Sequence, residues 1–153
     1  MENLKLKFPP IIQVIFFAII IALLDKVYPV TAIPLNYSAW VALFLVVIGA
    51  FIVLWGGLCF RKASTTVDPR YPSNTTALVI VGIYQHTRNP MYLGMLFSLL
   101  GIVVYFGSLS SVFVLPFFIW TMNEFQIQWE EKALLEKFGQ PYQEYLDNVR
   151  RWI

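Results

Sequence analysis

The longest stretch without a charged residue, residues 89–123, constrains the fold more than any other feature of this sequence. As one helix rising about 1.5 Å per residue it would be roughly 50 Å long, well beyond the roughly 30 Å hydrocarbon core of a bilayer. The only cluster of turn-forming residues inside it is 106–111, which contains Gly107 and three serines. The stretch therefore predicts two membrane passes, about 90–106 and 109–125, joined by a tight helical hairpin.

Composition and two further uncharged runs extend this prediction to the whole chain. Of the 153 residues, 58% are hydrophobic and 13% are charged, and the mean hydropathy is +0.65; a soluble domain carries about 25% charged residues. Residues 8–24 and 37–60 are each apolar and long enough, or nearly so, to cross a bilayer. We expect an all-α fold: a single membrane domain over residues 1–153 with four transmembrane helices. A cleaved signal peptide is the competing interpretation of residues 8–24, but the run is long for one and no small-x-small cleavage site precedes Asp25.

The basic residues predict the orientation. Four passes place both termini, the polar connector 61–89 and the segment 126–153 on one side of the membrane. That side then holds ten of the 11 basic residues, and only Lys26 lies opposite. Because basic residues favour the cytoplasmic side, we expect an integral membrane protein, of the plasma membrane or a bacterial inner membrane, with both termini cytoplasmic.

A polar stretch leads directly into the first helix of the hairpin. Asn89-Pro90 is typical of a helix start, since Asn favours the N-cap and Pro is tolerated at the first helical position. The hairpin brings this start close to the segment after Glu124, so Arg88 is expected near Glu130 or Glu131. Two interpretations stay open: a salt bridge at the base of the hairpin, or a polar pocket. In a pocket, the helix N-terminus would offer N–H groups to a carboxylate or phosphate, and a Glu would accept from an ammonium or a ribose diol.

Three shorter patterns carry expectations about packing. Gly94, Ser98 and Gly101 fall near one face of the outgoing helix and predict a closely packed neighbour. Residues 124–139 predict an amphipathic helix, with Phe125, Trp129, Ala133 and Leu134 opposed to Glu130, Glu131, Lys132 and Glu136. Arg150-Arg151-Trp152 indicates contact with the headgroup layer.

Composition also excludes several classes of site. A net charge of +2 makes nucleic acid an unexpected partner. One cysteine, Cys59, and one histidine, His86, provide no Cys-based or His-based metal cluster, so no metal is expected. The sequence has no phosphate-binding glycine loop and no dinucleotide fingerprint.

In combination and order, the motifs of residues 60–152 resemble those of the isoprenylcysteine carboxyl methyltransferase family, which is related to the phospholipid N-methyltransferases. The motifs are Gly82-Ile83-Tyr84, the run from Arg88-Asn89-Pro90 to Tyr92-Leu93-Gly94, the pair Glu130-Glu131, and Phe138-Gly139 followed by Tyr142, Tyr145 and Val149. The resemblance implies a membrane enzyme that uses S-adenosylmethionine, bound on the cytoplasmic side under the C-terminal segment. The expected acceptor is small or lipophilic, with the bilayer as surroundings, and carboxylate, thiol and amine acceptors all remain open.

The resemblance also implies site residues. Arg88 would shape the pocket and Glu130 would anchor the cofactor, and both are predicted to serve catalysis. The other cofactor contacts that it implies are Val81, Gly82, Ile83, Tyr84, Asn89, Pro90, Tyr92, Gly94, Met95, Leu96, Phe97 and Glu131. Asn123 and Gln126 would face the acceptor.

Two positions depart from the family pattern. Eukaryotic members have His where this chain has Asn89, which resembles bacterial relatives and still donates a hydrogen bond. Carboxyl-methylating members have an Arg four residues before the cofactor Glu, where this chain has Gln126. A neutral amide does not pair with a carboxylate as a guanidinium does, which argues against a prenylcysteine carboxyl acceptor.

Two other functions compete with methyl transfer. Sterol reductases that use NADPH share a similar Phe-Gly and spaced-Tyr segment, but this chain has no Arg-rich run before Phe138 for a 2′-phosphate. A non-enzymatic scaffold or lipid-binding protein is the third interpretation. The clustering of Arg, Asn, Tyr and Glu at one membrane face argues against it.

Overall fold

The structure, a computed structural model, describes residues 9–28, 30, 38–65 and 75–153, and every regular element within them is a helix. This confirms the all-α prediction for the described part of the chain. The helices in chain order are α1 (Pro10–Val27), α2 (Ser38–Lys62), the 3-10 helix η3 (Gly82–Gln85), α3 (Pro90–Phe106), α4 (Leu109–Val112), α5 (Val114–Met122), the π-helix η4 (Asn123–Ile127), α6 (Gln128–Phe138) and α7 (Gln140–Asn148).

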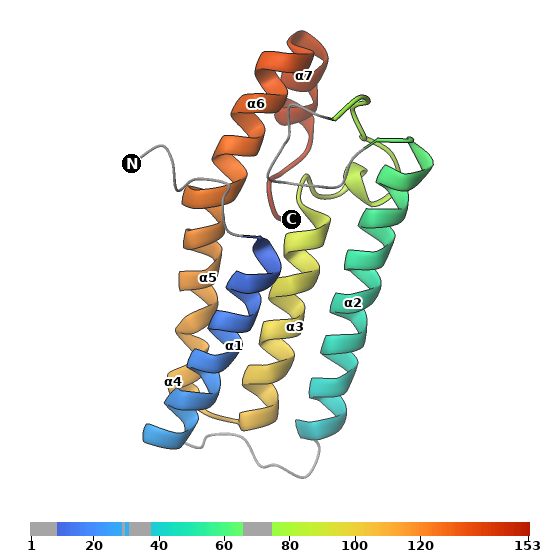
Figure 1. Ribbon diagram of the computed structural model, residues 1–153. Coiled ribbons are helices and arrows are strands. Elements are labelled where there is room, and N and C mark those ends of the chain that lie inside the picture. The colour runs from blue at the N-terminus through green and yellow to red at the C-terminus, as the bar shows by residue number, and fades with distance from the viewer. Residues whose placement is uncertain (1–8, 29, 31–37, 66–74) are drawn as a thin grey trace.

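The long helices stand side by side and alternate in direction (Figure 1). α1 and α3 run downward in that view, whereas α2 and the column formed by α4, α5, η4 and α6 run upward. η3, α7 and the C-terminus lie at the upper end, near the first turn of α3. The polar segments named in the sequence are therefore gathered at one end of the bundle.

The hairpin predicted at residues 106–111 is present. α3 ends at Phe106, and Gly107 follows in the left-handed region with φ +69°, a conformation that glycine adopts without a steric penalty. The serines after it bind α1: Ser111 Oγ donates to the Ile21 carbonyl at 3.3 Å, and Ser110 Oγ donates to that of Tyr28 at 3.1 Å. The turn thus joins α3 to α4 and also ties both to the end of α1.

Small residues allow α2 and α3 to approach closely, as the glycine pattern predicted. A Cβ atom added to Gly49 would collide with the Gly94 carbonyl, and one added to Gly94 would collide with the Gly49 carbonyl. About two turns further along α3, Gly101 lies against the backbone of Ala42 in the same way. Backbone proximity of this kind is how helices associate in lipid, where burial of apolar side chains gives little net driving force.

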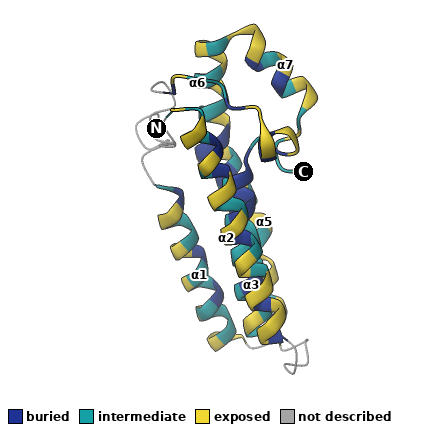
Figure 2. Ribbon diagram, turned by 90° about the vertical axis from the view of Figure 1, so that its right-hand side faces the viewer, coloured by how far each residue is buried: buried dark blue, intermediate teal, exposed yellow. Residues whose placement is uncertain are grey.

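α1, α3 and α5 share a conventional apolar core. Phe17 and Ile21 of α1 pack with Leu99 of α3 and with Phe118 and Met122 of α5, all essentially inaccessible. In contrast, α1 and α2 also carry many exposed large apolar residues, coloured yellow in Figure 2. Such surfaces are expected where lipid, and not water, surrounds the helix.

Among the described residues, two helices, α1 and α2, are long and apolar enough to cross a membrane, and α3 is a shorter apolar helix of 17 residues. α1 continues through Asp25 and Lys26 to Val27, one turn beyond the expected end. A lysine in the last turn is favourable there because it lies close to the negative end of the helix dipole.

The return column is less regular than a single helix over 109–125. α4 is separated from α5 at Phe113, and α5 leads into the π-helix η4 before α6 begins. The expected amphipathic helix forms, but the prediction for its polar face was wrong in part. Lys132 and Glu136 are exposed as expected, whereas Glu130 and Glu131 are partly buried and take part in interior contacts.

Candidate functional site

The first turn of α3 begins where the sequence predicted. Asn89 occupies the N-cap position and Pro90 is the first helical residue. The Asn89 side chain, however, does not cap the helix: its Nδ2 donates to the backbone carbonyl of Arg151 at 3.0 Å. Thr87 Oγ1 donates to the same carbonyl at 3.3 Å. The entry to α3 therefore holds a segment that follows it by more than 60 residues in sequence.

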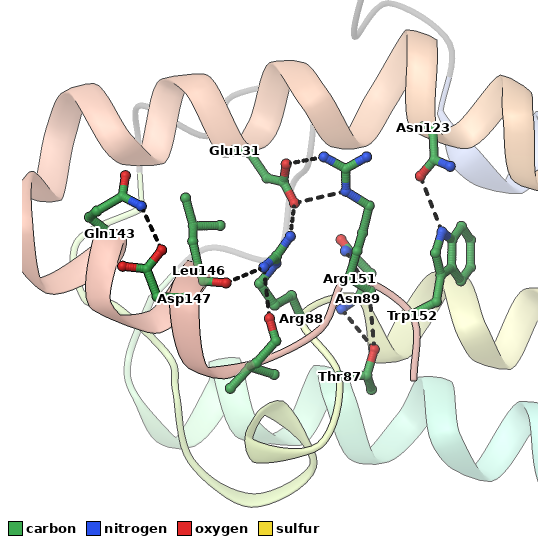
Figure 3. Close-up of polar contacts among 11 residues, drawn as sticks. Thr87, Arg88, Asn89, Asn123, Glu131, Gln143, Leu146, Asp147, Arg151 and Trp152 are labelled. Carbon is green, nitrogen blue, oxygen red and sulfur yellow. Dashed lines mark hydrogen bonds and ion pairs between the residues drawn. The ribbon is translucent and has the colours of Figure 1, made fainter.

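Arg88 makes most of its contacts to the end of α7 and the residues that follow it (Figure 3). Its Nη1 donates to the carbonyls of Leu146 and Val149 at 2.8 and 2.7 Å, and its backbone N–H donates to the Arg150 carbonyl at 3.0 Å. Its Nη2 pairs with Glu131 Oε1 at 2.9 Å. One side chain thus joins α3, α6 and the end of α7.

Glu131 lies between two arginines. Besides Arg88, it accepts from Arg151 through both carboxylate oxygens, at 2.6 Å from Nη2 and 3.1 Å from Nε. The side chains of Arg88 and Glu131 are only 13% and 15% exposed, and that of Arg151 is 32% exposed. Two-point pairing at low exposure is stronger than an ordinary surface ion pair. The salt bridge expected for Arg88 is confirmed with Glu131.

Glu130 faces a different set of groups. Its Oε1 accepts from the Tyr92 hydroxyl and from Gln126 Nε2, each at 2.5 Å. Gln126 is buried in η4, and π-helical turns inside α-helices are frequent at functional sites. The three residues form a compact polar cluster between α3 and the return column, below called the Glu130 cluster.

The Glu130 carboxyl titrates in an unusual range. Burial raises its pKa from 4.5 to about 7, an increase that the hydrogen bonds from Tyr92 and Gln126 oppose and the Glu131 charge reinforces. The site therefore holds an acid whose charge changes near neutral pH, which is a common property of functional carboxyls.

Arg88 also carries an unsatisfied donor. Its Nε atom is buried and has no hydrogen-bond partner among the described residues, although both of its terminal nitrogens are engaged. A buried donor of this kind is costly unless something accepts from it. This donor and the Glu130 cluster are thus two polar features at the upper end of the bundle that can bind a further group.

The remaining predicted residues lie in three settings. Ile83 and Tyr84 are buried with Tyr142 and Tyr145, and Tyr145 Oη donates to the Tyr84 carbonyl at 2.6 Å. Burial raises the pKa of the Tyr84, Tyr142 and Tyr145 hydroxyls, which keeps them neutral. Among the other predicted residues, Val81 is exposed and Gly82 has a φ of +63°. Pro90 and Gly94 face α2. Met95, Leu96 and Phe97 are partly buried.

Gly94 therefore has a packing role whether or not it contacts a cofactor, because α2 fills the space beside it. Asn123 accepts a hydrogen bond at its Oδ1 from Trp152 Nε1, at 3.1 Å. No group of three or more Cys, His, Asp or Glu side chains suited to a metal ion is present in the described ranges.

The sequence did not predict Arg151 and Trp152 as members of the site. Arg151 and Trp152 were expected at the headgroup layer, but their side chains bind Glu131 and Asn123. The only signal for them was indirect: partly buried carboxyl and amide groups on α6 and η4 require partners. Nothing in the spacing indicated that residues 149–152 would supply them.

Comparison with known proteins gives these residues a context. The sequence model of the phospholipid methyltransferase family matches residues 37–141, more than half of the chain. An uncharacterized protein of Haemophilus influenzae is 40% identical over 63 residues, which cover 41% of this chain and all of that protein. No solved structure matches.

Two relatives have informative names. The protein-S-isoprenylcysteine O-methyltransferase of Schizosaccharomyces pombe is 32% identical over 72 residues, which are 47% of this chain and 30% of that protein. A probable protein-S-isoprenylcysteine O-methyltransferase of Oryza sativa subsp. indica is 26% identical over 113 residues, which are 74% of this chain and 59% of that protein. The match thus spans about a third to three fifths of these longer relatives.

Proposed function

Since the chain belongs to the phospholipid methyltransferase family, we propose that it transfers a methyl group from S-adenosylmethionine to a small or lipophilic acceptor at the cytoplasmic face of a membrane. The observation that carries this proposal is the Glu130 cluster, which lies beside the first turn of α3. The family match suggests methyl transfer as the chemistry of this site.

The described residues fit the charged ends of this cofactor. The buried Nε of Arg88 and the first turn of α3 provide donors for a carboxylate. Glu130 provides an acceptor for an ammonium or a ribose diol. Asn89, Tyr84 and the neighbouring residues predicted from the resemblance would complete the contacts. Glu131, which is already paired with two arginines, would act by fixing Arg88.

S-adenosylmethionine supplies an activated methyl group on a sulfonium, so the protein mainly has to align the reactants and exclude water. Tyr92 and Gln126 hold the Glu130 carboxylate in one orientation. Arg88 keeps the segment after α7 against the entry to α3. We assign Glu130 a direct contact with the cofactor. Arg88 has two roles: its Nε would donate to the cofactor carboxylate, and its Nη1 positions the segment after α7.

The acceptor side would be formed by Gln126 and Asn123. Gln126 donates its amide to Glu130 and carries no charge, and the two arginines that pair with α6 among the described residues, Arg88 and Arg151, both bind Glu131. Neither of these arginines is therefore free to pair with a carboxylate acceptor, whereas an amine or thiol acceptor needs no such cation. We therefore propose an acceptor other than the one in the names of the isoprenylcysteine relatives.

The same proposal includes the topology. Four passes with the hairpin turn outside would put the Glu130 cluster at the cytoplasmic boundary, where a soluble cofactor and a lipophilic acceptor can both arrive. The distribution of basic residues supports this orientation.

Calorimetric titration in detergent with S-adenosylhomocysteine, the demethylated product, tests the proposal against NADPH binding. We expect S-adenosylhomocysteine to bind and NADPH not to bind. Glu130→Gln should weaken binding about tenfold or more, because a hydrogen bond to a charged group is lost. Glu136→Gln is the matched control and should bind normally, because Glu136 is exposed and lies six residues after Glu130 on the same helix. NADPH binding would favour a reductase, and binding of neither compound would favour a scaffold.

A further inference from the structure

The segment after α7, residues 149–152, crosses between the two elements that hold the Glu130 cluster. Three backbone carbonyls, those of Val149, Arg150 and Arg151, accept hydrogen bonds from Thr87, Arg88 and Asn89 at the entry to α3. The segment is therefore held along one edge by backbone contacts.

Its other edge is held by two side chains. Arg151 pairs with Glu131 of α6, and Trp152 Nε1 donates to Asn123 at the start of η4. Figure 3 shows both contacts, from Arg151 to Glu131 and from Trp152 to Asn123. Along the chain, Asn123 precedes Gln126 and Glu131 follows Glu130. The Trp152 ring also packs against the core cluster that contains Tyr92, Met122 and Ile127.

The segment thus bridges the same two elements as the Tyr92–Glu130 hydrogen bond. Tyr92 lies about one turn further into α3 than Thr87–Asn89, so the segment lies on the connector side of the cluster. The segment is not helical, because α7 ends at Asn148, and the Arg151 side chain is about one-third exposed. Without the Arg151 and Trp152 contacts the segment would be held only by its bonds to Thr87, Arg88 and Asn89, so it should leave the entry to α3 more often while the long helices stay in place.

We propose that residues 149–152 form a gate over the Glu130 cluster, closed by the Arg151–Glu131 ion pair and the Trp152–Asn123 hydrogen bond. This rests on the proposed function, because the cofactor is the ligand that the gate admits and retains. Arg151 and Trp152 act as positioning residues: they set how often the site opens.

One backbone amide reports on the gate without any ligand. The Arg88 N–H donates to the Arg150 carbonyl, so its hydrogen exchange requires the segment to move away. The Leu93 N–H, which donates to the Asn89 carbonyl within α3, is an internal reference. Arg151→Gln and Trp152→Phe should each speed exchange at Arg88 about three- to tenfold, the effect of one lost contact, and leave Leu93 unchanged. The exposed Arg150→Gln removes a neighbouring charge and is the control.

Stopped-flow binding of S-adenosylhomocysteine then tests the gating role. Arg151→Gln and Trp152→Phe should raise both the association and dissociation rate constants, each by about three- to tenfold, because the open population increases. The gate is refuted if S-adenosylhomocysteine binds and neither variant changes these rates, even when Arg88 exchange is faster. Unchanged Arg88 exchange in both variants also refutes it. If the wild type does not bind S-adenosylhomocysteine, the proposed function fails, and the exchange data alone show whether the two contacts hold the segment closed.

Discussion

Glu130 and Glu131 are adjacent in the sequence, but the structure gives them different surroundings. Glu131 pairs with two arginines, whereas the Glu130 carboxyl accepts from a phenol and an amide and, within the part of the chain that the structure describes, from no arginine. Neighbouring residues on α6 therefore have different roles: Glu131 holds Arg88 and Arg151 in place, whereas the pKa of Glu130 lies near neutral pH. The difference arises because consecutive side chains on a helix are about 100° apart.

The raised pKa of Glu130 leads to a prediction about pH. Below about 7 the carboxyl is mainly protonated and neutral, and above about 7 it is charged. A ligand that places an ammonium or hydroxyl donors on this group prefers the charged form. The affinity for S-adenosylhomocysteine, measured by calorimetry between pH 5.5 and 8, should therefore increase with pH and level off above about 7.

Two variants test the origin of this dependence. Glu130→Gln should bind weakly with little change over the same pH range. Tyr92→Phe removes a hydrogen bond that lowers the Glu130 pKa, so the inflection should move to higher pH. An unshifted inflection in Tyr92→Phe, or an unchanged pH profile in Glu130→Gln, would assign the titration to another group.

At the scale of elements, the contact between α2 and α3 depends on glycine. Gly49 and Gly94 each lie against the other's carbonyl oxygen, so the two helices cannot keep this distance if either gains a Cβ. The sequence predicted a close neighbour for Gly94 and Gly101, but a single sequence did not specify which helix it was. The same helix face has room for only one close partner, and in the structure that partner is α2.

Gly49→Ala should lower stability by about 1–3 kcal/mol, because the added methyl meets backbone and not a movable side chain. Gly57→Ala is the matched control: it lies in the same helix with nothing within 4 Å of its added Cβ. There the higher helix propensity of Ala should leave stability unchanged or raise it by up to about 1 kcal/mol. Unfolding in mixed detergent micelles measures both, and equal losses would show that the α2–α3 distance is not limiting.

The return column shows what local pattern alone does not predict. The uncharged run that leads into this column, which contains one proline, gave no indication of the π-helix at Asn123–Ile127. The wider turn of that π-helix sets the direction of Gln126 relative to Glu130. Helical type at this level depends on tertiary contacts. Here these contacts include the Trp152 hydrogen bond to Asn123, the first residue of the π-helix.

At the scale of the whole molecule, all described polar contacts of the candidate site lie at one end of the bundle, and the end of α1 and the α3–α4 turn lie at the other (Figure 1). If the chain crosses the membrane four times, these two ends face opposite compartments. The exposed Lys26 and the exposed Lys132 mark the two ends.

Cysteine labelling tests this orientation. In a Cys59→Ser background, an impermeant maleimide added to intact cells should modify Lys26→Cys and should not modify Lys132→Cys until the cells are opened. Labelling of both positions, or of Lys132→Cys alone, in intact cells would contradict the proposed topology.

The sequence by itself determined the helical class, the hairpin, the start of α3 and the family, because each depends on local features: apolar length, turn residues, a Pro after an N-cap residue, and short ordered motifs. It also brought Arg88 close to the Glu130-Glu131 pair, since a hairpin of fixed length makes its two ends neighbours. Only the tertiary structure decided that Arg88 pairs with Glu131, that Glu130 binds Tyr92 and Gln126, and that residues 149–152 lie across them. Most of those contacts join residues about 20 to 65 positions apart, some through side chains and some through backbone carbonyls. Every residue carries a backbone carbonyl, so no sequence pattern distinguishes the carbonyls that accept these hydrogen bonds.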